Sequence, residues 1–136
     1  MDNSEDQFNS LLAELMLRTN RALSMGEDPP LMALVMNAAG KSQLFVGVAD
    51  SEEQLATILV QFTNALSSLA QKEEIVASCV AHFRKDEGCV IVELENNEND
   101  CAHVVIPVLP SPARQLVMQE MVVGDGSVRI FPLGNS

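Results

Sequence analysis

The chain has 136 residues, 47% of them hydrophobic, and a formal net charge of -11, which fits one globular domain over residues 1–136 and excludes a disordered chain. Its 19 acidic residues against 8 basic ones repel phosphate backbones, so we expect no direct nucleic-acid binding. No run approaches the ~18 uncharged apolar residues of a membrane span, so we expect no membrane partner.

The first residues and the cysteines predict a cytoplasmic setting. The opening stretch MDNSEDQF carries acids where a secretory signal would carry basic residues and then an apolar run. The three cysteines, Cys79, Cys89 and Cys101, are an odd number. We therefore expect reduced thiols.

The first predicted element is a helix over about 4–25. Ser4 and Gln7 have the spacing of a capping box, and apolar residues then recur at intervals of three and four. Gly26, followed by Pro29 and Pro30, is a helix stop signal.

A β-hairpin and a second helix follow. The runs 31–38 and 44–49 are short and almost uniformly apolar, which predicts two paired strands covered on both faces. Ser51 and Gln54 repeat the capping-box spacing, and the helical period of apolar residues continues to about Gln71. The second helix is therefore predicted over 52–71.

The second half of the chain changes to a period of two. Residues 74–84, 88–95 and 101–109 are predicted as a three-stranded meander, although 73–84 also has the features of a helix start. Ser111 and Pro112 predict the N-terminus of a short helix reaching Met121. The turn at 124–126 then predicts a last strand over 127–133.

This order predicts an α+β fold: a mainly antiparallel sheet with both long helices packed on one face, because hairpins and meanders need no crossover. The helices should bury Leu11, Leu15, Leu55, Leu59 and Phe62. The order of helix, hairpin, helix and meander resembles that of roadblock and profilin-like domains. That resemblance, of element order alone, implies a dimeric scaffold and assigns no site residue.

The sequence Ala39-Gly40-Lys41-Ser42 ends like a phosphate-binding P-loop. The full motif requires a glycine where the chain has Val35, and the following residues favour a strand rather than a helix. We interpret this segment as a hairpin turn.

Histidines and cysteines form the next candidate set. If the meander turns at 85–87 and 96–100, His82 lies opposite Ile91 and His103 lies opposite Glu93. Alternation then places His82, Cys89, Glu93, Cys101 and His103 on one face and Cys79 on the other. Cys89 and Cys101 lie at opposite ends of the middle strand, too far apart to share a zinc ion, so we expect no metal.

The facing pair His103 and Glu93 has two interpretations. It can be a cross-strand ion pair at a surface or interface, or a general base with its orienting carboxylate. Cys101 is ~6.5 Å along the strand from His103, too far for His103 to activate its thiol. The ion pair is the preferred interpretation.

Acidic residues are concentrated between positions 86 and 100, where no basic residue occurs: Asp86, Glu87, Glu93, Glu95, Glu98 and Asp100. They indicate either a solvated hairpin that keeps a sheet edge soluble or a docking surface for a basic partner. We expect that this acidic hairpin carries the function.

Two functions from different classes follow. The first is a small, acidic protein-interaction module (an adaptor, a chaperone or an inhibitor of a basic partner) that forms a homodimer and needs neither cofactor nor catalytic residue. The homodimer is expected because Met16, Leu17 and Met25 add apolar surface to the first helix. The alternative is an enzyme whose site is assembled around His103 and Glu93.

Overall fold

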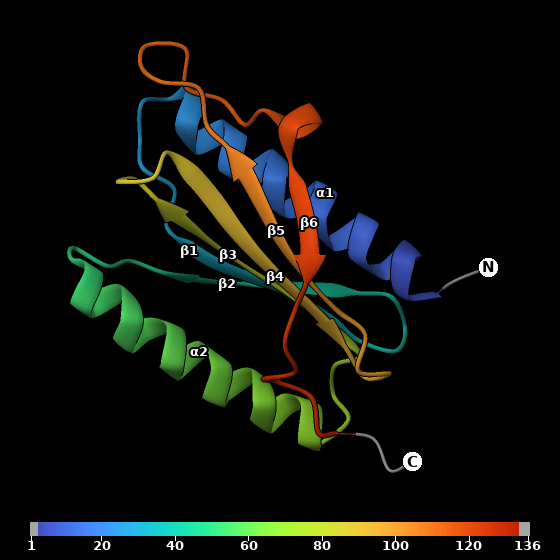
Figure 1. Cartoon of the computed structure of the whole chain (residues 1–136). Helices are drawn as coiled ribbons and strands as arrows, with labels where there is room; N and C mark the ends of the chain where they lie inside the picture. The colour runs from blue at the N-terminus through green and yellow to red at the C-terminus, as the bar shows by residue number, and fades with distance from the viewer. Residues whose placement is uncertain (1–2, 134–136) are drawn as a thin grey trace.

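The computed structural model describes residues 3–133 and contains one antiparallel sheet with two long helices (Figure 1). The elements in chain order are α1 (Asn3–Ser24), β1 (Leu31–Met36), β2 (Ser42–Gly47), α2 (Glu52–Gln71), β3 (Ala77–Arg84), β4 (Cys89–Asn96), β5 (Cys101–Pro107), the short 3-10 helix η1 (Met118–Glu120) and β6 (Val122–Asp125). The predicted α+β class, antiparallel sheet and element order are confirmed.

The sheet has the strand order β2-β1-β3-β4-β5-β6, so β2 and β6 are its two edges within the described residues. The predicted meander registers are confirmed, since His82 pairs with Ile91 and Glu93 pairs with His103. Residues 77–84 are a strand, which decides between the two possibilities for that segment.

The two helices cover opposite faces of the sheet, so their predicted placement on one face is wrong (Figure 1). β1 shows the reason, because consecutive residues of a strand point to opposite faces and five of its six residues are buried. Met32 and Leu34 pack in the cluster of α1, whereas Leu31 and Ala33 pack in the cluster of α2. A strand that is apolar on both faces requires a helix on each.

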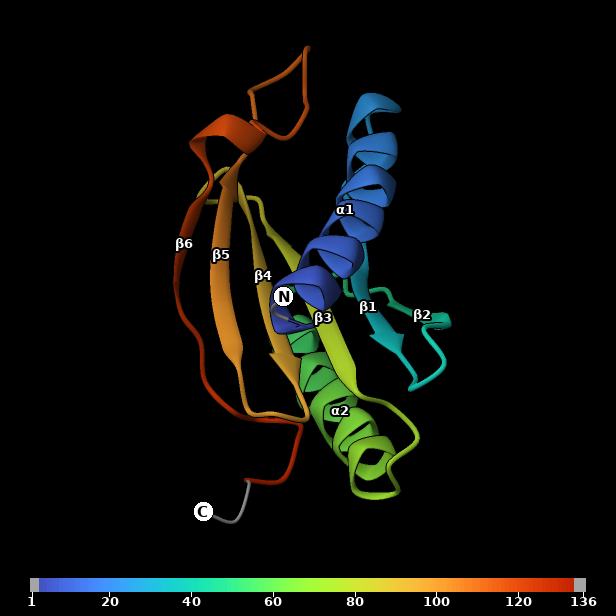
Figure 2. The ribbon, with the colours of Figure 1, turned by 90° about the vertical axis from the view of Figure 1, so that its right-hand side faces the viewer.

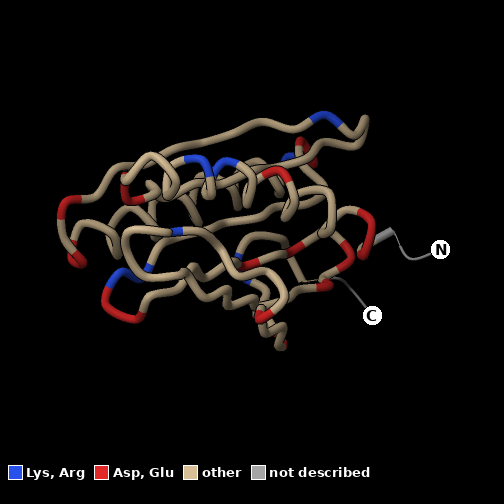
Figure 3. Tube along the Cα trace, turned by 90° about the horizontal axis from the view of Figure 1, so that it is seen from above, with Lys and Arg blue, Asp and Glu red and all other residues tan. Residues whose placement is uncertain are grey.

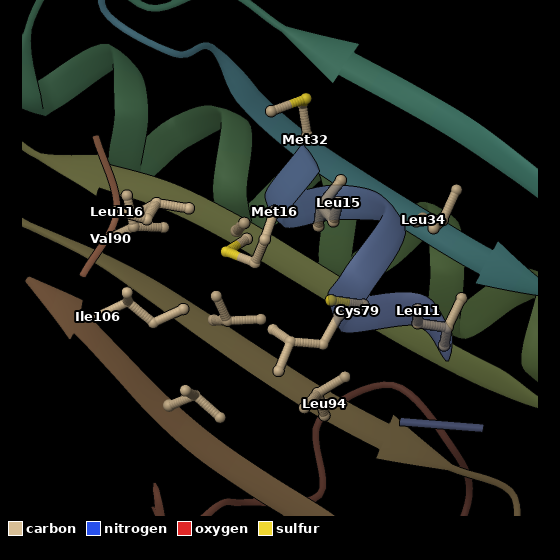
Figure 4. Packing of buried hydrophobic residues seen from close by; sticks show 14 of the residues in the cluster. Leu11, Leu15, Met16, Met32, Leu34, Cys79, Val90, Leu94, Ile106 and Leu116 are labelled. Carbon is tan, nitrogen blue, oxygen red and sulfur yellow. The ribbon is translucent and has the colours of Figure 1, made fainter. Parts of the chain in front are cut away.

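The larger core lies between α1 and the sheet (Figure 4). Leu11 and Leu15 are fully buried there, as predicted, together with Cys79 and Ile106. Met16 is also buried and contributes to this core rather than to an exposed surface, while Leu17 and Met25 are exposed.

α2 lies over the β2 side of the opposite face. A Cβ on Gly47 would be 2.8 Å from Ile58 Cγ2, which shows how closely the helix approaches the β2 backbone. Leu55, Leu59 and Phe62 are half-buried in this cluster. The predicted cap is confirmed, since the Gln54 backbone N–H donates to Ser51 Oγ at 3.1 Å.

The helix predicted after Pro112 is wrong. The chain instead forms a loop in which the Leu109 N–H donates to the Gln115 carbonyl and the Val117 N–H to the Pro107 carbonyl. This loop places Leu116 in the α1 core, while Met121 stays partly exposed. Only residues 118–120 form a helical turn, because β5 continues to hold the loop backbone.

The predicted last strand is also misplaced. The strand occupies residues 122–125, and residues 127–133 are an irregular segment that passes to the α2 side of the sheet (Figure 1). Gly126 allows the crossing, because a Cβ there would be 2.8 Å from the backbone nitrogen of Ala102. Ile130 and Phe131 then bury themselves in the α2 cluster. No helix in residues 3–133 combines the length and apolar character needed to cross a bilayer.

Candidate functional site

The facing pair on β4 and β5 makes a direct contact. His103 Nδ1 lies 2.5 Å from Glu93 Oε1, and both side chains are half-buried. The predicted cross-strand pair is therefore present on the α2 side of the sheet.

His82 lies on the same face, one strand away from Glu93. Burial lowers the pKa of His82, and nearby Arg84 lowers it further while Glu93 opposes the shift. A hollow of about 280 Å³ between α2, β3 and β4 is lined by His82 and Glu93, together with Ser127 of the C-terminal segment. His103 is not among its lining residues, so only Glu93 of the predicted pair faces this hollow.

The cysteines are separated, as their register requires. Cys79 lies in the α1 core, where burial raises the pKa of its thiol, and Cys89 and Cys101 lie at opposite ends of β4 and β5. Burial, followed by the neighbouring Glu95 carboxylate, raises the pKa of Cys101. All three are free thiols, and the described residues contain no group of three side chains arranged to hold a metal ion.

The six candidate acids do not form one surface (Figure 3). Asp86 and Glu87 lie in the β3–β4 turn and form ion pairs with Arg84. Glu98 and Asp100 lie in the β4–β5 turn, at the other end of a strand that spans ~20 Å or more. The six acids of the predicted acidic hairpin are thus divided between its two ends, because β4 separates the two turns.

Glu95 is buried, with 4% of its surface exposed, and its carboxylate accepts backbone N–H groups from Arg129, Ile130 and Phe131 at 2.8–3.0 Å. No local sequence pattern predicts this contact, because the donors lie more than thirty residues away in a segment expected to be a strand. Glu95 therefore anchors the C-terminal segment and is not available to a partner.

Asp100 belongs to a second polar network. Buried Asn96 donates to Ser4 Oγ at 2.7 Å and to Gln7 Oε1 at 3.1 Å, and Ser4 Oγ donates to Asp100. The predicted capping box of α1 is thus wrong, since Ser4 is already helical and its hydroxyl binds the β4–β5 turn. A strong local pattern was overridden by a tertiary contact.

An apolar groove lies between α1 and the last two strands. We call it the α1–β6 groove; its volume is about 410 Å³, and its lining includes Phe8, Leu12, Ala102, Met121 and Val123. The charged lining residues are Glu5 and Asp100, both acidic. α1 packs mainly on β1, β3 and β4, and Figure 2 shows β6 at the far edge of the sheet from this helix.

β6 itself is exposed at all four residues. Val123 faces the α1–β6 groove, and Val122 faces the opposite side, where it pairs with Val105. With Met121, these are three consecutive apolar residues that are 38%, 66% and 58% exposed. We call residues 121–125 the β6 edge.

The P-loop-like segment is a hairpin turn, as interpreted. Asn37 Oδ1 accepts the N–H groups of Ala39 and Lys41, and Gly40 has a φ of 81°. Strand β2 follows it directly, so no helix N-terminus faces the turn. Residues 42–49 of the β2 edge carry no charge, and the positions after Ser42 and Gln43 are apolar or glycine.

Comparisons with protein-family models, with curated proteins and with solved structures found no match to this chain. The likeness to roadblock and profilin-like domains is thus one of element order.

Proposed function

We propose that this chain is a protein-interaction module that binds a basic protein partner at the β6 edge and the adjoining α1–β6 groove. The observation that carries the proposal is the exposure of Met121, Val122 and Val123 on a sheet edge that neither helix covers. Contiguous apolar side chains on an unpaired edge are unfavourable in water and are typical of binding surfaces.

Charge favours a basic partner. Glu5 and Asp100 line the groove, Glu120 directly precedes the β6 edge, Asp125 is its last residue, and the whole chain carries a charge of -11. Of the six acids singled out in the sequence, Asp100 lines this groove and remains in the proposal. Such a field accelerates capture of a cationic protein and opposes binding to nucleic acid.

We also propose a homodimer that forms through the opposite edge, β2. Antiparallel pairing of two β2 strands would bring Lys41 of one copy near Asp50 of the other, because Lys41 directly precedes the uncharged strand and Asp50 follows its end by three residues. Val46, which is 53% exposed, would become covered. This arrangement leaves both β6 edges of the dimer open.

The module would work in the cytoplasm without a cofactor. The three free thiols, none of them paired with another, are compatible with a reducing compartment. Binding at a sheet edge requires no catalytic side chain.

An enzyme is the second candidate, favoured by the 2.5 Å contact between His103 and Glu93. A carboxylate in this position can orient an imidazole that acts as a general base. The His103 side chain is 39% exposed, so a substrate would meet it at the surface, beside the hollow that Glu93 and His82 line. Chemical shifts of the His103 ring that respond to a small-molecule library would support this function, and shifts confined to the β6 edge would oppose it.

Capture of partners from a lysate of the native host tests the module. We would compare the parent chain, Val123→Lys and the matched control Val60→Lys, which adds the same charge at an exposed valine of α2. The expected result is a basic protein retained by the parent and the control at low salt, released at ~1 M salt and lost with Val123→Lys. Identical retention by all three baits would contradict the proposal.

A further inference from the structure

We infer, on the basis of the function proposed above, that the partner binds as an extended strand added to the free edge of β6. The partner segment would have consecutive apolar side chains in its centre, which point to both faces of the sheet, and Lys or Arg at both ends. The sheet would then continue beyond β6 into the partner.

The two valines of β6 favour a partner that binds as a strand over one that binds as a helix. Val122 and Val123 are consecutive, so their side chains point to opposite faces of the sheet. A helix lying in the α1–β6 groove would cover Val123 and leave Val122 in water. A strand placed ~4.8 Å beyond β6 contacts both.

The backbone of β6 supports the same geometry. Within residues 3–133, β6 pairs with β5 alone, and its register places Val123 opposite Val104 and Val122 opposite Val105. Alternate N–H and C=O groups of an edge strand point away from the sheet and are available to another strand. Strand addition satisfies these groups while it buries the valines.

Charge opposes pairing of β6 with the β6 strand of a second copy of this chain. Antiparallel pairing of two β6 strands centred on Val122 or Val123 would place Asp125 of each copy opposite residue 119 or 121 of the other, one position away from Glu120. These two acidic residues would therefore come close to each other at both ends of the pair, and their repulsion would weaken it. A partner strand with a basic residue at each end would instead be attracted to Glu120 and Asp125.

The experiment uses a fluorescent synthetic peptide with a Val-Ile-Val centre and two lysines at each end, titrated with the full chain at low salt. We expect saturable binding that Val122→Lys and Val123→Lys each weaken by about tenfold, while Val60→Lys leaves it unchanged. We also expect slower backbone hydrogen exchange at residues 121–125 in the complex, because added hydrogen bonds protect those amides.

The outcomes separate this inference from the proposed function. If Val123→Lys weakens binding and Val122→Lys does not, the partner lies in the groove, and strand addition is overturned while the module survives. If the peptide does not bind at ~1 mM, or if neither variant weakens it, both fail. A dimer in light scattering that Val122→Lys dissociates would identify a second copy as the occupant and overturn the inference.

Discussion

Glu95 accepts the backbone N–H of Ile130 with both of its carboxylate oxygens, each at 3.0 Å. The same carboxylate also binds the neighbouring N–H groups of Arg129 and Phe131. Glu95, a residue of β4, thus holds an irregular segment against α2. By doing so it keeps Ile130 and Phe131 in their apolar contacts with the α2 cluster.

Replacing Glu95 by Gln should destabilise the fold by ~2 kcal/mol, because it removes a charge-assisted acceptor and turns an amide N–H₂ toward a backbone donor. Urea denaturation measures the loss, and hydrogen exchange at Ile130 should accelerate. Glu98→Gln is the matched control in the exposed turn and should change stability by less than ~0.5 kcal/mol. Equal effects of the two substitutions would show that Glu95 does not anchor the segment.

Asn96 connects the start of α1 with the β4–β5 turn. Its side chain donates to Ser4 and Gln7, and its Oδ1 accepts the N–H groups of Glu98 and Asp100, each at 3.0 Å. Asn96→Ala should therefore cost ~2–3 kcal/mol in urea denaturation, since it leaves several partners unsatisfied.

Asn97→Ala is the control for that substitution, because Asn97 is exposed and its described bond to the Val76 carbonyl uses backbone N–H alone. It should lie within ~0.5 kcal/mol of the parent. A similar cost for both substitutions would mean that the turn, rather than the Asn96 network, limits stability.

His82 should make the protein less stable as the pH falls. Burial, with Arg84 adding to the shift against Glu93, holds the folded pKa of His82 below its usual ~6.5. At a pH between the folded pKa and the unfolded pKa of ~6.5, the unfolded chain binds more protons than the folded one. The free energy of unfolding therefore decreases as the pH is lowered through ~6.5. His82→Gln should flatten this dependence between pH 7.5 and 5.5 in urea melts, and an unchanged slope would refute the assignment.

The proposed β2 dimer has its own charge test. Lys41→Glu should weaken self-association several-fold at low salt, because it replaces attraction to Asp50 of the second copy by repulsion. The double variant Lys41→Glu with Asp50→Lys should restore it, as followed by light scattering across a concentration series. A monomeric parent chain at ~100 μM would contradict the dimer.

The sequence alone determined the features that depend on neighbouring residues. The helix at 52–71 was predicted at its observed bounds because its Ser51 cap and its apolar period are both local. The facing of His103 and Glu93 followed from the position of one turn, since an antiparallel hairpin transmits its register along both strands.

Only the tertiary structure decided which groups far apart in the chain meet. Ser4 had the local pattern of a helix cap, yet the β4–β5 turn offers it Asn96 and Asp100, and that contact prevails. Glu95 was expected to serve a partner, but a segment more than thirty residues further on supplies its donors. Local patterns rank the backbone conformations available to a short stretch, whereas long-range burial selects among them, because a buried polar group must find its partners wherever the fold brings them.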